Sequence, residues 1–258
     1  MNKPLIAGAA VVVIGGLLGL WYYLESGSSG PATDASSAST AQMPPPEPGI
    51  AHPVPSADTG PPPDMDHSDA ELQAVLPPVI GAAAVKDFLE HENMVRRFVV
   101  TVDNIPRQKL PLERRPVQKV AGTFLVQGDD THATLDPANY ARYRPYVAVV
   151  RNLDVTALMK VYVRFYPLLQ HTYENLGYPK GYFNDRLVES IDVLLATPQL
   201  TGPVDLVRPN VMYQFADPAL EAKPAGQKLM LRMGPDNAAA IKEKLTEMRA
   251  ALTAASPH

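Results

Sequence analysis

Two residues at helical spacing could take part in metal chemistry. His171 and Glu174 form a His-x-x-Glu pair, which places an imidazole and a carboxylate on one face of a helix, a spacing that metal sites use. His91 and His132 could complete the set of ligands. One such pair alone is more typical of a solvated surface, and we predict no metal and no other cofactor.

Four acidic residues could instead act as a general acid and a general base. Asp185, Glu189 and Asp192 recur on one predicted helical face, and Glu174 lies close to them in the sequence. Two carboxylates at the right separation can hydrolyse a glycosidic bond. The competing interpretation, which we favour, is the charged outer face of an amphipathic helix.

Other catalytic patterns are poorly represented in the chain. It contains no cysteine, which excludes a thiol nucleophile, a disulfide framework and a cysteine-ligated metal. Ser190 falls within a predicted helix and lacks the Gly-x-Ser-x-Gly setting of a hydrolase nucleophile. No P-loop, dinucleotide fingerprint or zinc signature occurs. These observations favour a protein without catalytic activity.

Basic side chains are concentrated between residues 96 and 119. Seven lysines and arginines stand there against two acids, Asp103 and Glu113, and three prolines favour an exposed loop over residues 107–119. Such a patch could contact anionic headgroups, wall polymers or an acidic protein. The alternative is solubilising charge that pairs within the protein. The predicted binding residues in this segment are Arg96, Arg97, Arg107, Lys109, Arg114 and Arg115.

Three tyrosines surround the Gly-Tyr-Pro-Lys-Gly segment at residues 177–181. If they are exposed, Tyr173, Tyr178 and Tyr182 could stack on sugars or anchor a protein partner. If they are buried, they belong to the core. We add Tyr178 and Tyr182 to the predicted binding residues.

The N-terminal segment predicts a membrane anchor. Residues 5–24, from Leu5 to Leu24, contain no charged residue and have the length of about 20 residues that crosses a bilayer. The aromatic residues at 21–23 suit the interface, and Lys3 places residues 1–4 in the cytoplasm and the rest outside. A cleaved signal peptide is the alternative, although the apolar run is long for one.

Residues 25–67 are predicted to be a disordered linker, because they are rich in Pro, Ser and Ala and show no apolar periodicity. This linker is acidic and has no lysine or arginine, and it carries the negative balance of the chain. The remaining body is nearly neutral, so nucleic acid is an improbable partner.

Residues 68–255 are predicted to form one α+β domain that is predominantly α-helical. Apolar periodicity indicates seven or eight helices, among them residues 68–76, 82–91 and 94–105, with Ser68, Asp154 and Asn184 among the N-caps. Asp103 is expected on an exposed face. Two short β-hairpins, residues 123–127 with 132–135 and residues 204–207 with 211–215, are expected to pair into one small sheet.

Four runs give the chain a likeness to a known family. They are RRFVVTVDNIPR (residues 96–107), LDPANYARY (135–143), LGYPKGYFNDRLVESIDVLLATP (176–198) and LRMGPDN (231–237). Together they resemble the bacterial domain of unknown function 3014 family over about residues 80–252. The resemblance implies a shared fold and a membrane-tethered placement, but no activity and no functional residues.

These observations together predict a single-pass protein of the bacterial inner membrane whose body faces the periplasm. We expect a non-enzymatic binding or adaptor module with a protein or an anionic envelope component as its partner. An envelope glycan hydrolase that uses paired carboxylates is the alternative.

Overall fold

Four amphipathic helices supply most of the core. The structure is a computed structural model that describes residues 49–55, 63–129, 132–210 and 212–254. The helices are α5 (Met94–Asn104), α7 (Val155–Asn175), α8 (Phe183–Leu195) and α11 (Pro235–Thr253). Helix α5 packs on α7 and α8, and α11 packs on α8 and α7. Apolar residues from all four helices fill the centre, including Phe98, Leu158, Phe183, Leu187, Ile191, Ile241 and Leu245.

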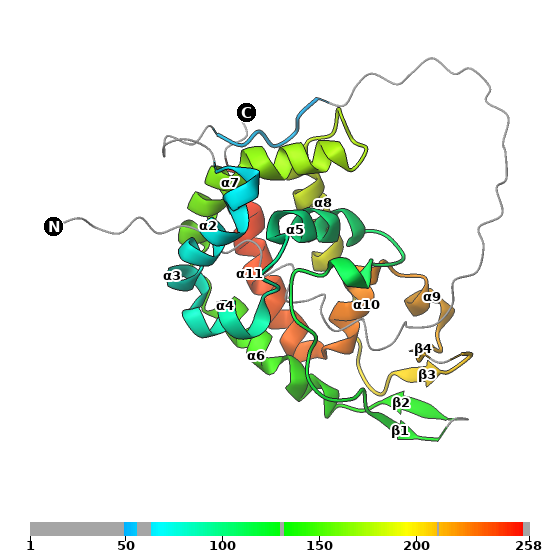
Figure 1. Cartoon of the computed structure of the whole chain (residues 1–258). Coiled ribbons are helices and arrows are strands. Elements are labelled where there is room, and N and C mark those ends of the chain that lie inside the picture. The colour runs from blue at the N-terminus through cyan, green and yellow to red at the C-terminus, as the bar shows by residue number, and fades with distance from the viewer. Residues whose placement is uncertain (1–48, 56–62, 130–131, 211, 255–258) are drawn as a thin grey trace, which may run out of the picture.

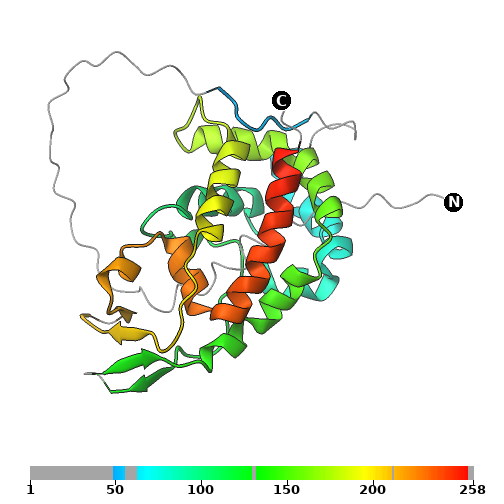
Figure 2. The ribbon, with the colours of Figure 1, turned by 180° about the vertical axis from the view of Figure 1, so that it is seen from behind.

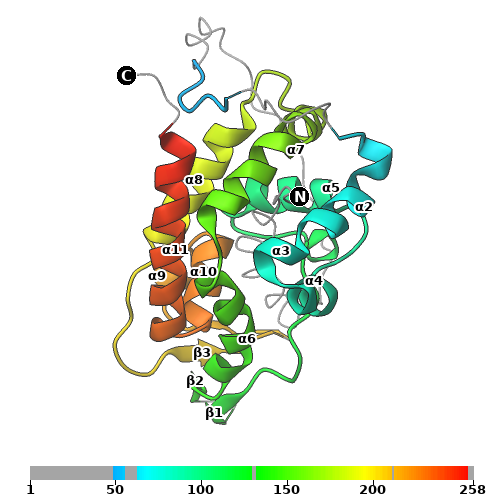
Figure 3. The same ribbon diagram turned by 90° about the vertical axis from the view of Figure 1, so that its left-hand side faces the viewer.

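The remaining helices cover this core. Helix α6 (Asn139–Arg151) lies along α11, and α10 (Ala225–Arg232) packs against α8. Figure 2 shows α11 running beside α8 and α6. The N-terminal elements η2 (Met65–His67), α2 (Ser68–Val75), α3 (Pro77–Ile80) and α4 (Ala82–Phe88) form a side layer, which Figure 3 shows face-on. Two short helices, η3 (Leu112–Arg114) and α9 (Pro218–Glu221), lie in the connections.

The two predicted hairpins are present and join into one antiparallel sheet, as expected. The sheet has four strands, which are β1 (Val126–Gly128), β2 (Ala133–Leu135), β3 (Asp205–Val207) and β4 (Gln214–Phe215). They lie side by side in the order in which they occur in the chain. Strand β2 joins the hairpins through the pairing of Ala133 with Leu206. The inner face buries Leu135, Leu206 and Phe215 against Leu231 of α10. The sheet lies at one end of the body (Figure 1).

Helix boundaries agree with the predictions where local signals set them. Asp154 accepts a hydrogen bond from the backbone N–H of Ala157 at 3.0 Å and caps α7. Asp217 caps α9 in the same way through Ala219, at 2.8 Å. Gly177, after α7, has the positive φ of 109° that favours glycine.

Two predicted N-caps are wrong. Ser68 is the first residue of α2 rather than its cap, and its hydroxyl donates to the carbonyl of Met65 at 2.8 Å. Asn184 lies inside α8, which begins one residue earlier, and its side chain is fully buried. Pro77 and Pro78 end α2 as expected but also begin α3, because proline is tolerated in the first turn of a helix.

The predicted membrane segment, residues 5–24, lies outside the described residues, as does most of the predicted linker. Among the residues that the structure does describe, no helix has the length and apolarity needed to cross a bilayer.

Candidate functional site

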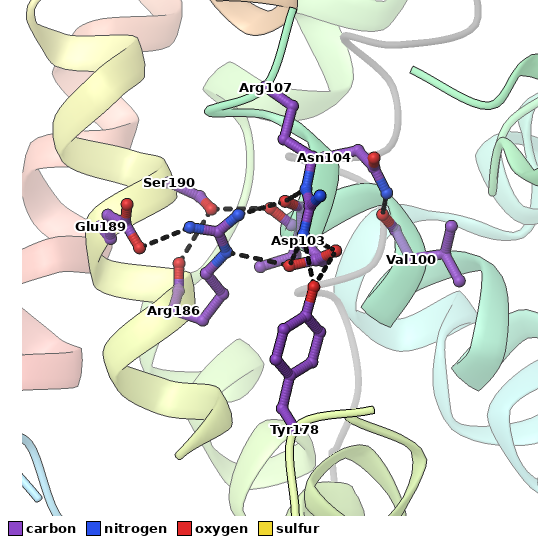
Figure 4. Close-up of polar contacts among 9 residues, drawn as sticks. Val100, Asp103, Asn104, Arg107, Tyr178, Arg186, Glu189 and Ser190 are labelled. Atoms are coloured by element: carbon purple, nitrogen blue, oxygen red, sulfur yellow. Dashed lines mark hydrogen bonds and ion pairs between the residues drawn. The ribbon is translucent and has the colours of Figure 1, made fainter. Parts of the chain in front are cut away.

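A buried carboxylate lies where α5 meets α8. The side chain of Asp103 is 8 % exposed, and it contacts two arginines and a tyrosine (Figure 4). Arg107 Nη2 lies 3.0 Å from Asp103 Oδ2, and Arg186 Nε lies 3.2 Å from Asp103 Oδ1. The hydroxyl of Tyr178 lies 3.3 Å from Asp103 Oδ2 and also contacts Arg107. We call Asp103, Arg107, Tyr178 and Arg186 the Asp103 cluster. The expectation that Asp103 is exposed is therefore wrong.

The Asp103 cluster also completes the C-terminal end of α5. The last carbonyl groups of a helix lack partners within the helix and carry partial negative charge. Arg107 Nε donates to the carbonyl of Asp103 at 3.2 Å, and Arg186 donates to the same carbonyl. Ser190, also on α8, donates its hydroxyl to the carbonyl of Val102 at 2.8 Å. Side chains of α8 thus cap the end of α5, and Ser190 serves this contact.

The guanidinium of Arg107 keeps its charge in the Asp103 cluster. Burial opposes the charge of Arg107, but the carboxylate of Asp103 and the hydroxyl of Tyr178 outweigh it and raise the pKa of Arg107 above its ordinary value. Arg186 also pairs with Glu189, at 2.6 Å. A carboxylate held by two guanidinium groups is suited to fixing helices in place rather than to transferring protons.

Half of the predicted basic residues are used inside the protein. Arg97 Nη1 donates to the carbonyls of Glu113 at 2.8 Å and Arg115 at 3.0 Å. Arg115 pairs with Glu90 at 3.7 Å. With Arg107 in the Asp103 cluster, these arginines hold the loop of residues 107–119 against α5.

The other half remains on the surface. Arg96, Lys109 and Arg114 are exposed, and their side chains have no hydrogen-bond or ion-pair partner within the described part of the chain. Because Arg97 holds the backbone on both sides of Arg114, this residue is presented from a fixed loop. We call Arg96, Lys109 and Arg114 the open cations.

The predicted tyrosines occupy different environments. Tyr173 is buried, and Tyr178 stacks on it with ring centroids 4.7 Å apart and an interplanar angle of 22°. Tyr182 is partly buried, and its ring centroid lies 5.5 Å from that of Tyr166. The hydroxyls of Tyr178 and Tyr182 both take part in internal contacts, so their role in binding a partner stays a prediction.

A short segment of the predicted linker docks on the start of α8. We call residues 49–55 the strap. Asp185 accepts hydrogen bonds from the backbone N–H groups of Ala51 and His52 at 3.0 and 2.8 Å. The hydroxyl of Tyr182 accepts one from Val54 at 2.8 Å. The strap lies inside the predicted linker of residues 25–67, so this part of it has a defined place on the body.

Asn184 connects the strap to the core. Its Nδ2 donates to the carbonyl of His52 at 2.8 Å, and its Oδ1 accepts a hydrogen bond from Tyr162 at 2.8 Å. Burial raises the pKa of Tyr162 well above its ordinary value, which keeps this hydroxyl protonated as a donor. The sequence alone predicts a helix cap at Asn184, because its actual partners, His52 and Tyr162, lie far away in the chain.

The predicted acid and base candidates each have a separate partner. Glu174 accepts a hydrogen bond from Gln170 at 2.8 Å, and Asp192 pairs with Arg249 at 3.1 Å. Asp185 holds the strap, and Glu189 pairs with Arg186. Each of the four carboxylates therefore contacts a different group of the protein.

The histidines proposed as metal ligands are also separated. His171 Nε2 lies 3.0 Å from the side-chain amide of Asn175, and His91 Nε2 lies 3.0 Å from the carbonyl of Val85. In the described ranges of the chain, no three His, Asp or Glu side chains are grouped as metal ligands would be.

Comparison with known proteins gives one match. The model of a family described as "Protein of unknown function (DUF3014)" matches residues 94–249. No curated protein and no solved structure matches the chain.

The first prediction concerns the Asp103 cluster. Replacing Asp103 with Ala is expected to lower the free energy of unfolding by about 3–5 kcal/mol, because it removes the buried carboxylate that Arg107 and Arg186 share and leaves Arg186 with only the exposed Glu189. Replacing Arg107 with Ala is expected to cost less than about 1 kcal/mol, since the Arg107 side chain is 48 % exposed. Urea unfolding followed by circular dichroism measures both variants. Similar losses for the two would contradict the assignment of Asp103 as the buried centre.

The second prediction concerns the strap. In Asp185→Ala the backbone N–H groups of Ala51 and His52 lose a charged acceptor, so their hydrogen exchange should accelerate about tenfold or more. Exchange followed by mass spectrometry measures this. The matched control is Asp192→Ala, which removes a carboxylate from the same helix at its contact with Arg249. Unchanged exchange in Asp185→Ala would show that this carboxylate does not hold the strap.

Proposed function

The chain belongs to the DUF3014 family of proteins of unknown function, and on this premise we propose that it is a membrane-tethered adaptor of the bacterial cell envelope. In this proposal residues 5–24 cross the inner membrane, the folded body faces the periplasm, and the body binds an anionic partner without catalysing a reaction.

The open cations carry the proposal. Arg96, Lys109 and Arg114 keep their charged groups in solvent and without a carboxylate among the described residues, whereas Arg97, Arg107 and Arg115 are bound within the fold. Charges that the fold does not use are available to an anionic surface, and their attraction is screened by salt. The docked loop adds pre-organisation, because the backbone on both sides of Arg114 is already held in place before a partner binds.

The position of the strap supports the tethering part of the proposal. The strap joins the body at the start of α8, at the end opposite the sheet (Figure 1). A chain that arrives from a membrane anchor would therefore hold the body by this end. The sheet end would then point away from the bilayer.

The partners of the acidic residues support a binding module over a hydrolase. Retaining and inverting glycosidases need two carboxylates that face one substrate. Here Glu174, Asp185, Glu189 and Asp192 are each engaged with a different internal group.

The third prediction tests the open cations. A photo-crosslinking amino acid at the exposed position of Glu113 should capture a partner in intact cells. The double variant Lys109→Glu/Arg114→Glu should reduce that capture at least tenfold, because placing like charges opposite one another at an interface costs several kcal/mol. In purified membranes the remaining wild-type capture should fall as salt is raised.

The matched control is Lys86→Glu/Lys160→Glu, which reverses two exposed lysines on α4 and α7 and makes the same change in net charge. It should keep full capture. Thermal unfolding should be equal in the two double variants. Equal capture by both, with both folded, would overturn the assignment of the binding surface.

The fourth prediction tests the topology. A reporter enzyme that matures only outside the cytoplasm should be active when fused after Gly60, and the product should remain with the membrane fraction. Activity of a cytoplasm-dependent reporter at the same position would reverse the orientation. A shortened product free of membranes would show that residues 5–24 are a cleaved signal peptide.

A further inference from the structure

A cleft with mostly apolar walls lies between the connection of residues 198–204, which leads into β3, and helices α6, α10 and α11. Its volume is about 270 Å³, and its walls include Leu200, Val204, Met230, Leu231 and Ala238. At about 30 Å³ for a water-sized group, the cleft has room for roughly nine such groups. This volume lies just below the usual range for small-molecule sites, which begins at about 300 Å³.

The wall of the cleft at the start of α11 is firmly built. Gly234 has a φ of 89°, and a Cβ atom there would lie 2.6 Å from the ring of Tyr140. Only glycine therefore allows the chain to pass this ring. The side-chain amide of Asn237 donates to the carbonyls of Tyr140 at 2.9 Å and Met233 at 2.8 Å. The cleft is thus shaped before any ligand arrives.

One cationic side chain, Lys242, lines this apolar cleft. Its ammonium donates to the carbonyl of Thr197, and among the described residues no carboxylate lies within ion-pairing distance of it. Burial lowers the pKa of Lys242. By contrast, Lys244 on the same helix pairs with Glu247 at 2.6 Å. An ammonium group has three donors, so Lys242 retains two for a ligand.

From this geometry we propose that the cleft binds a small amphiphile with one acidic head group. The head group contacts the ammonium of Lys242, and the apolar body lies along Leu200, Met230 and Leu231. An alkyl carboxylate of about eight carbons matches the space that the cleft offers. A partly buried ammonium beside apolar walls gains more from an anion than a fully exposed one does, which sets the sign of the head group. This site is separate from the open cations and does not depend on the proposed adaptor role.

Photolabelling with octanoate tests the site. Full-length protein in lipid nanodiscs is treated with a diazirine derivative of octanoate, and labelled residues are mapped by mass spectrometry. Labelling is expected in the cleft, on the segments around Leu200 and Ala239. Excess octanoate should compete, whereas excess octanol should compete at least tenfold less well.

Three variants separate the contributions of charge and shape. Lys242→Met keeps a long, unbranched side chain but removes the ammonium charge, so labelling of the cleft should fall about tenfold. Lys244→Met removes the same charge outside the cleft and should label like the wild type. Ala239→Phe adds volume at an exposed position of the cleft wall and should abolish labelling. Circular dichroism confirms that each variant is folded.

Three outcomes would overturn the proposal. The first is labelling of the wild type only outside the cleft. The second is equal competition by octanol and octanoate, which would show an apolar site without selection for charge. The third is an equal effect of Lys242→Met and Lys244→Met.

Discussion

The C-terminal end of α5 is joined to the rest of the body by one buried carboxylate and two arginines. Asp103 receives Arg107 from the loop that follows α5 and Arg186 from α8. The two arginines also donate hydrogen bonds to the backbone carbonyl of Asp103. The same two groups therefore neutralise the buried carboxylate and cap the C-terminal end of the helix. The Asp103 cluster therefore determines the direction of the loop of residues 107–119, the docking of α8 and the position of Tyr178. A change there would therefore alter the presentation of the open cations as well as the stability of the core.

The elements of this fold are largely readable from the sequence, while its polar junctions are not. Helix α5 follows from the spacing of its apolar residues, and the cap at Asp154 lies within three residues of its partner. The spacing of Asp103 and Arg107 is also a local signal for an ion pair. Burial of Asp103, however, depends on Arg186, which is more than 80 residues away. The contacts of Asn184 and the contact of Lys242 with the carbonyl of Thr197 likewise require the tertiary structure.

The runs that carry the family resemblance meet one another in pairs. The run at residues 96–107 supplies Asp103, and the run at residues 176–198 supplies Arg186. Tyr140, from the run at residues 135–143, packs on Gly234 and bonds to Asn237, both from the run at residues 231–237. These contacts are structural, which explains why the runs identify a fold without indicating a reaction. Lys109 and Arg114 lie outside all four runs.

If residues 5–24 are a membrane anchor, as proposed, the strap would give the tether a second length under mechanical load. Three hydrogen bonds join its backbone to Asp185 and Asn184 of α8, and another joins it to Tyr182 just before that helix. If a pulling force releases them, residues 49–55 become part of the free chain and extend it by about 25 Å. Such a contact yields before the helical core does, because it buries little apolar surface of its own. In the proposed tethered arrangement, the body would then move relative to the anchor without itself unfolding.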